Sequence, residues 1–395
     1  MVASPSTVEP TVELPRAQER LAIAALALAA FALNLNTNVL GALLPFVRED
    51  LALADGDGKY LIAAAALGSA IGALGAGPLT DRHGRRAILV AGLLAFVASS
   101  LAHLAASSFW PFCVLRALSG VAVGLAYAAA SALVAEVAPY ERRGAAMGGF
   151  TAGMFLAIPI GMPLSVALAK VGAWPAIFAV QAAVGALGCW WALRAVPVRP
   201  ADGRRGFGFV VLASGPVRAG LFATLLHVGS FFTTVQLATT WLDETGRVPK
   251  GDQLLLWVGL GLASVVGSAV FGRLSDRVGK RSFVLAASLV LIGCFAALAS
   301  EPGPLVLLGL GLLLAITAAA RTGPLQALVS GLVPVHQLGA LMGMRGCVMQ
   351  LGVFAFALSA APIASELGFS GVLLLAAGWQ LLSLLAIGLG VRGVR

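Results

Sequence analysis

The chain has 395 residues, of which 59% are hydrophobic and only 11% are charged, and its mean hydropathy is +0.95. Soluble domains are roughly 45–50% apolar and about 25% charged, so a soluble fold of this length could not bury so much apolar surface. Disorder is excluded for the same reason. The composition predicts a polytopic membrane protein and argues against a soluble enzyme, a nucleic-acid binder or a secreted disulfide scaffold.

The cysteines give no sign of metal or redox chemistry. Each of the four lies inside an apolar stretch, and no two have the spacing of metal ligands. We therefore expect free thiols that serve packing, with no metal and no cofactor.

Twelve apolar stretches are long enough to cross a bilayer as helices, which takes about 20 residues each. In the first half of the chain they are 21–47, 59–79, 87–107, 109–138, 144–169 and 173–193. In the second half they are 218–241, 252–274, 282–300, 304–333, 338–363 and 368–391. Their length and their continuous Ala-, Leu- and Gly-rich composition favour helices over barrel strands. The expected fold class is an all-α polytopic membrane protein.

The basic residues predict the orientation of these helices. With the N-terminus in the cytoplasm, the cytoplasmic segments hold 18 of the 26 Lys and Arg residues and the outer loops hold five. This bias predicts that both termini are cytoplasmic, and it explains the net charge of +9 without nucleic acid. The apolar run from Leu21 is too long for a signal peptide, so we expect it to be the first span.

The chain contains an internal repeat. The run from Gly77 to Arg86 matches the run from Gly272 to Arg281, and 144–148 matches 339–343 at the same offset of 195 residues. Because each half has six spans, the copies are parallel repeats, which favours a binding site between the halves. The expected segments are an N-terminal tail (1–20), an N-terminal half (21–193), a Pro- and Arg-rich cytoplasmic linker (194–217), a C-terminal half (218–391) and a C-terminal tail (392–395).

The repeated run resembles the signature loop between helices 2 and 3 of the major facilitator superfamily. That signature is Gly, two residues, a small residue, Asp, Arg, any residue, Gly and two basic residues. It is present in both halves of this chain, and the resemblance covers nearly the whole sequence. The resemblance implies a twelve-helix transporter of the bacterial drug and metabolite exporter branch, similar to drug:proton antiporters and arabinose efflux permeases, in a bacterial-type inner membrane.

The chemistry of the two loops predicts a gate. Gly84 and Gly279 permit tight turns, and Asp81 and Asp276 are carboxylates that can accept hydrogen bonds from a helix N-terminus. By pseudo-symmetry we expect Asp81 to meet the start of span 338–363 and Asp276 the start of span 144–169, which would latch the cytoplasmic side. Glu136, Arg142 and Arg143 are expected to join the Asp81 latch. The expected gating residues are Gly77, Asp81, Arg82, Gly84, Arg85, Arg86, Glu136, Arg142, Gly272, Asp276, Arg277, Gly279, Lys280 and Arg281.

Two further patterns resemble exporter motifs of the family. Arg116 with Gly120 resembles the helix 4 motif, whose arginine is linked to proton transfer, although a structural bond to a neighbouring helix is an equal alternative. Gly153, Pro159 and Gly161 resemble the glycine–proline antiporter motif of helix 5, with Ala157 in place of a usual Gly. Small residues allow close helix packing, and prolines kink a helix.

Polar groups at membrane depth suggest a cavity. In the family, helices 1, 4, 7 and 10 line the central cavity, and interhelical hydrogen bonds are the alternative interpretation for each polar residue alone. The substrate-binding candidates are Asn34, Asn38, Arg116, His227, Thr234, Arg321 and Gln350. All 17 acidic residues lie in termini, loops or span ends, so the deep arginines predict a preference for neutral or anionic solutes over cations. Proton coupling follows from the resemblance alone, although a histidine such as His227 can carry a proton.

These features predict a secondary transporter that works by alternating access, exports small drug-like or metabolite molecules and exchanges them for protons. An importer or exchanger of organic anions is one alternative, and a transport-inactive membrane sensor or assembly factor is another. The expected partners are a small-molecule substrate, the lipid bilayer and protons. Enzyme activity and ATP coupling are not expected, because no nucleophile–base pair lies at depth and the phosphate-loop motif is absent.

Overall fold

The computed structural model describes residues 14–51, 57–198, 208–246, 248 and 250–391. Parts of the predicted tails (1–20 and 392–395) and of the predicted linker (194–217) therefore lie outside the described residues. The long helices are α1 (Arg16–Asp50), α2 (Asp57–His83), α3 (Arg85–His103), α4 (Phe109–Val137), α5 (Arg143–Lys170), α6 (Ala176–Ala195), α7 (Gly215–Thr245), α8 (Lys250–Val278), α9 (Lys280–Ala299), α10 (Pro304–Ser330) and α11 (Leu338–Gly390). Three short 3₁₀ helices, η1 (Tyr140–Arg142), η2 (Gly208–Ala213) and η3 (Val335–Gln337), connect some of them.

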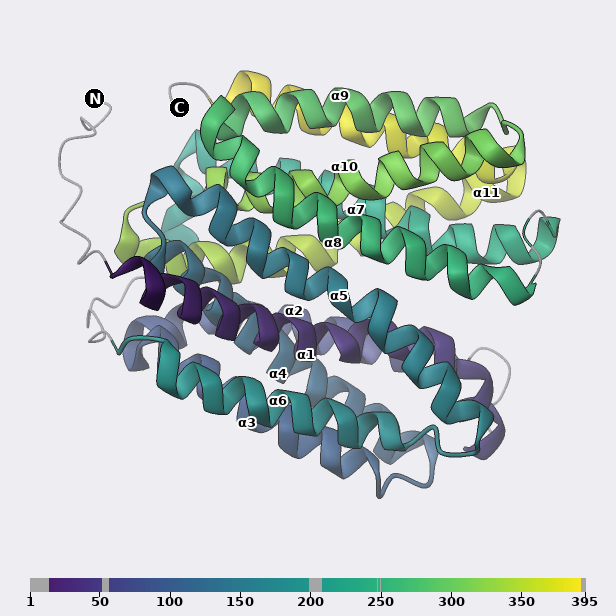
Figure 1. Cartoon of the computed structure of the whole chain (residues 1–395), viewed down its shortest axis with the longest axis horizontal. Coiled ribbons are helices and arrows are strands. Elements are labelled where there is room, and N and C mark those ends of the chain that lie inside the picture. The colour runs from purple at the N-terminus through teal and green to yellow at the C-terminus, as the bar shows by residue number, and fades with distance from the viewer. Residues whose placement is uncertain (1–13, 52–56, 199–207, 247, 249, 392–395) are drawn as a thin grey trace.

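The described residues contain eleven helices that are long and apolar enough to cross a membrane. The last of them, α11, has 53 residues and departs from helical geometry at Gly368, where φ is 66° and ψ is −164°. The chain folds back at this glycine, so α11 comprises two membrane-length segments (Figure 1). The all-α fold class is confirmed, and the two segments correspond to the predicted spans 338–363 and 368–391.

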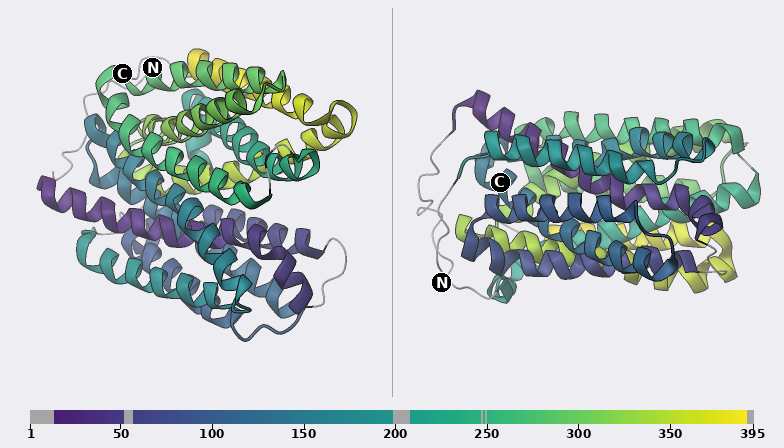
Figure 2. Two further views of the ribbon diagram at one scale, coloured as in Figure 1. Left: turned by 45° about the vertical axis from the view of Figure 1, so that its right-hand side comes forward. Right: turned by 90° about the horizontal axis from the view of Figure 1, so that it is seen from below.

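The helices form two bundles that lie side by side. We call α1–α6 the N-half and α7–α11 the C-half, and Figure 1 shows the N-half below the C-half. The left panel of Figure 2 shows the same separation from another direction. The helices run in antiparallel order, so the loop after α2 and the loop after α8 lie at the same end of the molecule. We call this the signature end, because both copies of the repeated motif are there.

Close backbone approach holds the N-half together. A Cβ atom added at Gly124 of α4 would lie 2.0 Å from the carbonyl oxygen of Ser69 in α2, which no side chain can tolerate. Gly68, Gly72 and Gly120 make equally close approaches between the same two helices. Small residues therefore let α2 and α4 pack backbone against backbone, as expected where the lipid provides no hydrophobic driving force between helices.

Glycines also bring the two halves together at the signature end. A Cβ at Gly272 of α8 would lie 2.6 Å from the carbonyl oxygen of Gly144 in α5. The repeat-related contact joins α2 to α11, where a Cβ at Gly77 would lie 3.0 Å from the Cα of Ala340. The two interfaces between the halves are therefore built from the same motif used twice.

Replacing Gly124 with alanine should destabilise the N-half. We expect Gly124→Ala to lower the apparent Tm in detergent, corresponding to about 1–3 kcal/mol, because the methyl group overpacks the α2–α4 contact. Gly293→Ala is the matched control, since nothing lies within 4 Å of a Cβ at that helical position. An equal or higher Tm for Gly124→Ala than for Gly293→Ala would contradict the packing account.

Candidate functional site

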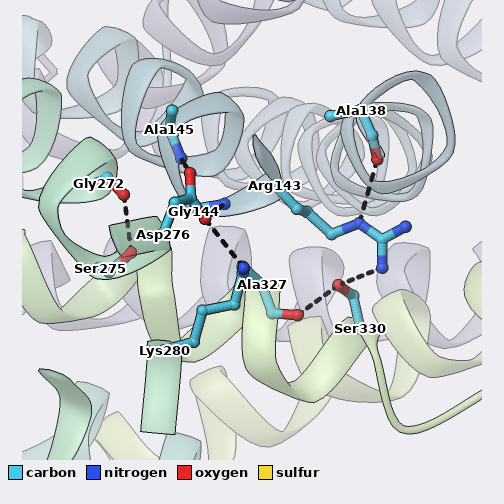
Figure 3. Close-up of polar contacts among 10 residues, drawn as sticks. All are labelled: Ala138, Arg143, Gly144, Ala145, Gly272, Ser275, Asp276, Lys280, Ala327 and Ser330. Atoms are coloured by element: carbon cyan, nitrogen blue, oxygen red, sulfur yellow. Dashed lines mark hydrogen bonds and ion pairs between the residues drawn. The ribbon is translucent and has the colours of Figure 1, made fainter. Parts of the chain in front are cut away.

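The second copy of the signature forms a latch between the halves. The two carboxylate oxygens of Asp276 accept hydrogen bonds from the backbone N–H groups of Gly144 (2.9 Å) and Ala145 (2.7 Å). Asp276 lies in the last turn of α8 in the C-half, whereas the two donors lie in the first turn of α5 in the N-half (Figure 3). The carboxylate therefore caps a helix of the opposite half, where the unpaired N–H groups and the helix dipole favour an anion. This is the contact that the sequence predicts for Asp276.

Cations and an aromatic ring surround this latch. The ammonium group of Lys280 lies 2.9 Å from Asp276 Oδ1 and 4.3 Å from the centre of the Tyr140 ring. Arg143 lies over the same ring and donates to Ser330 Oγ of α10 at 3.3 Å. Lys280 is almost fully buried here, since its side chain is 4% exposed. The latch is therefore a partly buried cluster with members from both halves. Figure 3 shows Asp276, Lys280, Arg143 and Ser330 of this cluster.

The first copy of the signature lies at the start of α11, as predicted. A Cβ added at Gly339 would lie 3.3 Å from Asp81 Oδ1 and 2.3 Å from Thr80 Oγ1. Arg85 pairs with Glu136 at the end of α4 and also donates to the backbone oxygen of Val335 in η3. Glu136 thus joins this side of the gate, and Arg85 connects it to the C-half.

Arg142 and Arg143 lie elsewhere than expected. The prediction that they join the Asp81 latch is wrong, because η1 precedes α5 and faces α1, α8 and α10 rather than α2. Arg142 pairs with Glu19 at the start of α1, with an N···O distance of 2.7 Å. Arg143 lies beside Tyr140, close to the Asp276 latch.

The remaining signature residues shape the turns and the helix ends. Gly84 and Gly279 have φ values of 84° and 92°, the left-handed conformation that the predicted tight turns require. Arg86 donates to the backbone oxygen of Leu193, and Arg281 donates to that of Gly388 at 2.8 Å. These arginines satisfy carbonyl groups near the C-terminal ends of α6 and α11. Arg82 and Arg277 are exposed.

The helix 4 arginine is buried within the N-half. Arg116 donates to the side-chain oxygen of Asn36 (2.6 Å) and to its backbone oxygen (3.2 Å), and it is 2% exposed. Its partner is thus a third asparagine of α1, which the candidate list omitted. Asn34 and Asn38 point away from Asn36 because they stand two residues from it on the helix. They are half-buried and bond to each other, with the Asn38 amide donating to Asn34 Oδ1 at 3.1 Å.

Arg321 and His227 are buried within the C-half. Arg321 is 0% exposed and donates to the hydroxyl oxygens of Ser288 in α9 (2.9 Å) and Ser383 in α11 (2.7 Å). The two ring nitrogens of His227 lie 3.3 Å from Thr322 Oγ1 and 3.2 Å from the amide nitrogen of Gln380. Both side chains face neighbouring helices of their own half, so the geometry favours the structural alternative for them.

Another set of polar groups lies where the halves meet. The guanidinium of Arg345 in α11 lies near the hydroxyl of Tyr127 in α4. This hydroxyl donates to Met154 Sδ of α5 at 3.4 Å. Phe155 of α5 stacks on Phe232 of α7 across the same interface, with ring centres 6.3 Å apart. Arg345 therefore reaches the opposite half, unlike the other two deep arginines.

Two buried polar groups of the C-half have unused hydrogen-bonding atoms. The amide of Gln326 is 0% exposed, and neither its nitrogen nor its oxygen has a partner in the described part of the chain. The hydroxyl oxygen of Thr234 likewise has none there. Gln350 is half-buried. Because buried polar groups normally bond, Gln326 and Thr234 are the candidates whose chemistry calls for a further partner.

The helix 5 motif serves packing on two sides. A Cβ at Gly153 would lie 2.3 Å from the backbone oxygen of Ala27 in α1, and one at Gly161 would lie 2.4 Å from the side chain of Leu35. Pro159 packs against Gly261 of α8. The motif therefore brings α5 close to α1 within the N-half and to α8 across the interface.

The charges at membrane depth are all basic. Among the described residues, the carboxylates lie at helix ends, in loops or beside the Gly368 reversal. A search of the same residues finds no group of three His, Cys, Asp or Glu side chains that could hold a metal ion. The buried polar side chains of the described helices include arginine, amide and hydroxyl groups.

Comparisons with known proteins agree with this geometry. The family model of the Major Facilitator Superfamily matches residues 26–251 and 220–393. An uncharacterized MFS-type transporter, YceJ of Bacillus subtilis (strain 168), is 24% identical over 82% of this chain and 84% of its own. A probable sugar efflux transporter of Helicobacter pylori (strain G27) is 26% identical over 67% of this chain and 68% of its own.

Solved structures share the fold. The MFS proton:xylose symporter XylE matches with a TM-score of 0.79 and 15% identity, over 93% of this chain and 95% of that one. The human organic anion transporter MFSD10 (TETRAN) matches with a TM-score of 0.77 and 18% identity, over 95% of this chain and 100% of that one. The membrane-length helices of the described residues, the duplicated signature and the family match lead to one conclusion: the chain belongs to the Major Facilitator Superfamily and is a secondary transporter.

Proposed function

We propose that this transporter exports small organic solutes by alternating access, with the two signature latches holding the signature end closed in the outward-facing state. The observation that carries this proposal is the Asp276 carboxylate, which accepts two N–H groups from the first turn of α5 in the other half. The names of several relatives, such as the probable sugar efflux transporter of Helicobacter pylori (strain G27), support the outward direction.

The latch makes the closed signature end more stable than the open one. Hydrogen bonds to a charged group contribute about 1.5–3 kcal/mol each, and those of Asp276 exist only while α5 and α8 are in contact at the signature end. Solute binding has to outweigh this contribution before the end opens. Such a latch therefore determines the relative populations of the outward-facing and inward-facing states. It does not change the contacts with the solute.

The charge distribution supports a preference for neutral polar or anionic solutes. Arg116 and Arg321 are engaged within their own halves, so Arg345 is the deep cation that remains at the interface. A positive charge there repels a cationic solute by about 2 kcal/mol at 8 Å with an effective dielectric constant near 20. The sugar and organic anion names of the compared proteins fit this preference. An organic-anion exchanger is accordingly the second candidate function.

The location and coupling are also part of the proposal. We place the signature end and both termini on the cytoplasmic side of a bacterial inner membrane, because the basic residues concentrate there. Proton coupling is supported by family membership, which includes the proton:xylose symporter among the compared structures. Antiport is proposed because the proposed direction of solute transport is outward. His103 and His227 are the described deep histidines, and each is bonded inside its own half.

Transport in inverted membrane vesicles tests the proposed function. Radiolabelled sugars and carboxylates selected by a thermal-shift panel should accumulate in inverted vesicles whose interior is acidified, and collapse of the pH gradient should abolish this accumulation. An exporter moves solute from the cytoplasmic to the outer side, which is the lumen of an inverted vesicle. Accumulation only in right-side-out vesicles would instead favour the importer, and none in either would favour the transport-inactive alternative.

Replacing Asp276 with asparagine should slow transport far more than it weakens solute binding. The amide presents one oxygen in place of two and adds N–H donors that face the donors of Gly144 and Ala145. We expect at least a tenfold loss in flux, because one or two charge-assisted hydrogen bonds disappear, with solute affinity changed by less than about threefold. Asp81→Asn should behave alike. The control Glu141→Gln alters an exposed carboxylate at the same end and should retain wild-type flux. A large loss of affinity with unchanged flux would contradict the latch.

Neutralising Arg345 should change the charge preference of the transporter. We expect Arg345→Gln to weaken binding of an anionic solute by about tenfold or more and to reduce the exclusion of a lipophilic cation. Arg345→Lys keeps the charge and should retain most of the preference, whereas Tyr127→Phe removes only the hydroxyl partner. Competition between anionic and cationic dyes in vesicles measures the effect. An unchanged ratio in Arg345→Gln, with normal membrane insertion, would exclude Arg345 from recognition.

A further inference from the structure

A basic pocket lies beside the Asp276 latch at the signature end, and its lining residues come mainly from α1, α5 and α8. Its volume is about 730 Å³, which is large enough for a phospholipid headgroup. The pocket takes its walls from both halves, because α1 and α5 belong to the N-half and α8 belongs to the C-half. The charged residues that line it are Arg16, Glu19, Arg20, Arg142, Arg273, Asp276 and Arg277.

The pocket has an excess of positive charge. Its two carboxylates are already occupied, since Glu19 pairs with Arg142, and Asp276 binds Lys280 and the start of α5. The other four arginines are exposed and have no acidic partner in the part of the chain that the structure describes, namely Arg16, Arg20, Arg273 and Arg277. Two of these come from α1 and two from α8. Among the described residues, four guanidinium groups therefore line one pocket without an acidic partner.

The inner wall of the pocket is apolar. On α1, the residues that follow the arginines toward the middle of the helix are apolar, namely Ile23, Ala24 and Ala27. On α5, Ala146 and Gly149 line the pocket in the same way. On α8, exposed apolar side chains continue away from the arginines at four-residue intervals, namely Leu274, Val270, Val266 and Leu262. Residues four apart share one helix face, so this stripe leads from the basic rim along the surface that faces lipid.

We propose that this pocket binds the headgroup of an anionic phospholipid and that the bound lipid holds the two halves together at the signature end. The guanidinium groups pair with the phosphate, for which arginine has well-suited geometry, and the acyl chains follow the apolar stripe of α8. Basic pockets between membrane helices are general sites for anionic headgroups. A free inorganic phosphate shares the headgroup chemistry but has no acyl chain for the apolar wall, and the proposal is therefore for the lipid.

The position of the pocket gives the lipid a regulatory effect. Arg20 of α1 and Arg273 of α8 reach the same anion only while the signature end is closed, because they lie in different halves. A ligand that binds one state better shifts the population toward that state. The anionic lipid therefore adds to the Asp276 latch and favours the closed signature end. This inference concerns a site separate from the solute site and does not depend on which solute is carried.

Lipid titration of the purified full-length protein, followed by native mass spectrometry, tests the proposal. Phosphatidylglycerol should bind at least tenfold more tightly than phosphatidylcholine to the wild-type protein, and inorganic phosphate should not compete at equal concentration. The double variant Arg20→Gln/Arg273→Gln should bind phosphatidylglycerol roughly 30-fold more weakly, because each basic residue near the membrane surface contributes about fivefold. Equal binding of the two lipids, or full competition by phosphate, would overturn the proposal.

Matched variants separate the pocket from general surface charge. Arg194→Gln removes an exposed arginine at the end of α6 that does not line the pocket, so it should leave phosphatidylglycerol binding at the wild-type level. Arg20→Lys/Arg273→Lys keeps both charges and should retain most of the binding, which also covers the case in which the glutamine variant folds poorly. Equal losses in Arg194→Gln and in the double glutamine variant would show that the pocket has no special role and would refute the proposal.

Discussion

The carboxylate of Asp276 at the start of α5 is the contact on which the proposed closure of the signature end depends. A helix start presents N–H groups that have no partner within the helix, and here a charged side chain from the other half satisfies two of them. The contact requires α5 and α8 to approach with almost no side chain between them, which Gly144, Gly148 and Gly272 allow. The motif thus combines a charge, a turn and a close approach in one short stretch.

The duplication of that motif places a second contact on the opposite side of the interface. Gly77 and Gly343 bring α2 and α11 together as Gly272 and Gly148 bring α8 and α5 together. The two contacts are not identical in detail, since Lys280 binds its own aspartate whereas Arg85 pairs with Glu136 and reaches Val335. The basic pocket lies beside the Asp276 latch.

The buried arginines Arg116 and Arg321 have neutral hydrogen-bond partners. Arg116 and Arg321 use neutral oxygen atoms of asparagine and serine as partners, so their positive charge is solvated but not cancelled. Each connects helices within one half. Arg345 differs because its partner Tyr127 is in the other half. The proposed preference for neutral or anionic solutes rests on this cation at the interface.

The sequence predicted the helices and the motif contacts much better than the inward-facing side chains. Apolar length located all twelve spans, and pseudo-symmetry placed Asp276 at α5, because both depend on spacing along the chain. The facing direction of Asn36, Arg321 and Arg345 depends on helix rotation, and a helix that is apolar all round carries no polar stripe that reports it. The partner of Arg142 was not predictable from spacing either, because Glu19 lies 123 residues away in sequence.

A distance measurement across the signature end tests the central claim most directly. Spin labels at Glu141 and Val278, both exposed beside the latch, report the separation of the N-half from the C-half. Pulsed electron paramagnetic resonance is measured on the full-length protein with the native cysteines replaced. When the latch is wild-type, it should give one short distance between the two labels. Asp276→Asn should add a longer distance as the open population grows. A distance distribution that stays unchanged in Asp276→Asn would contradict the account.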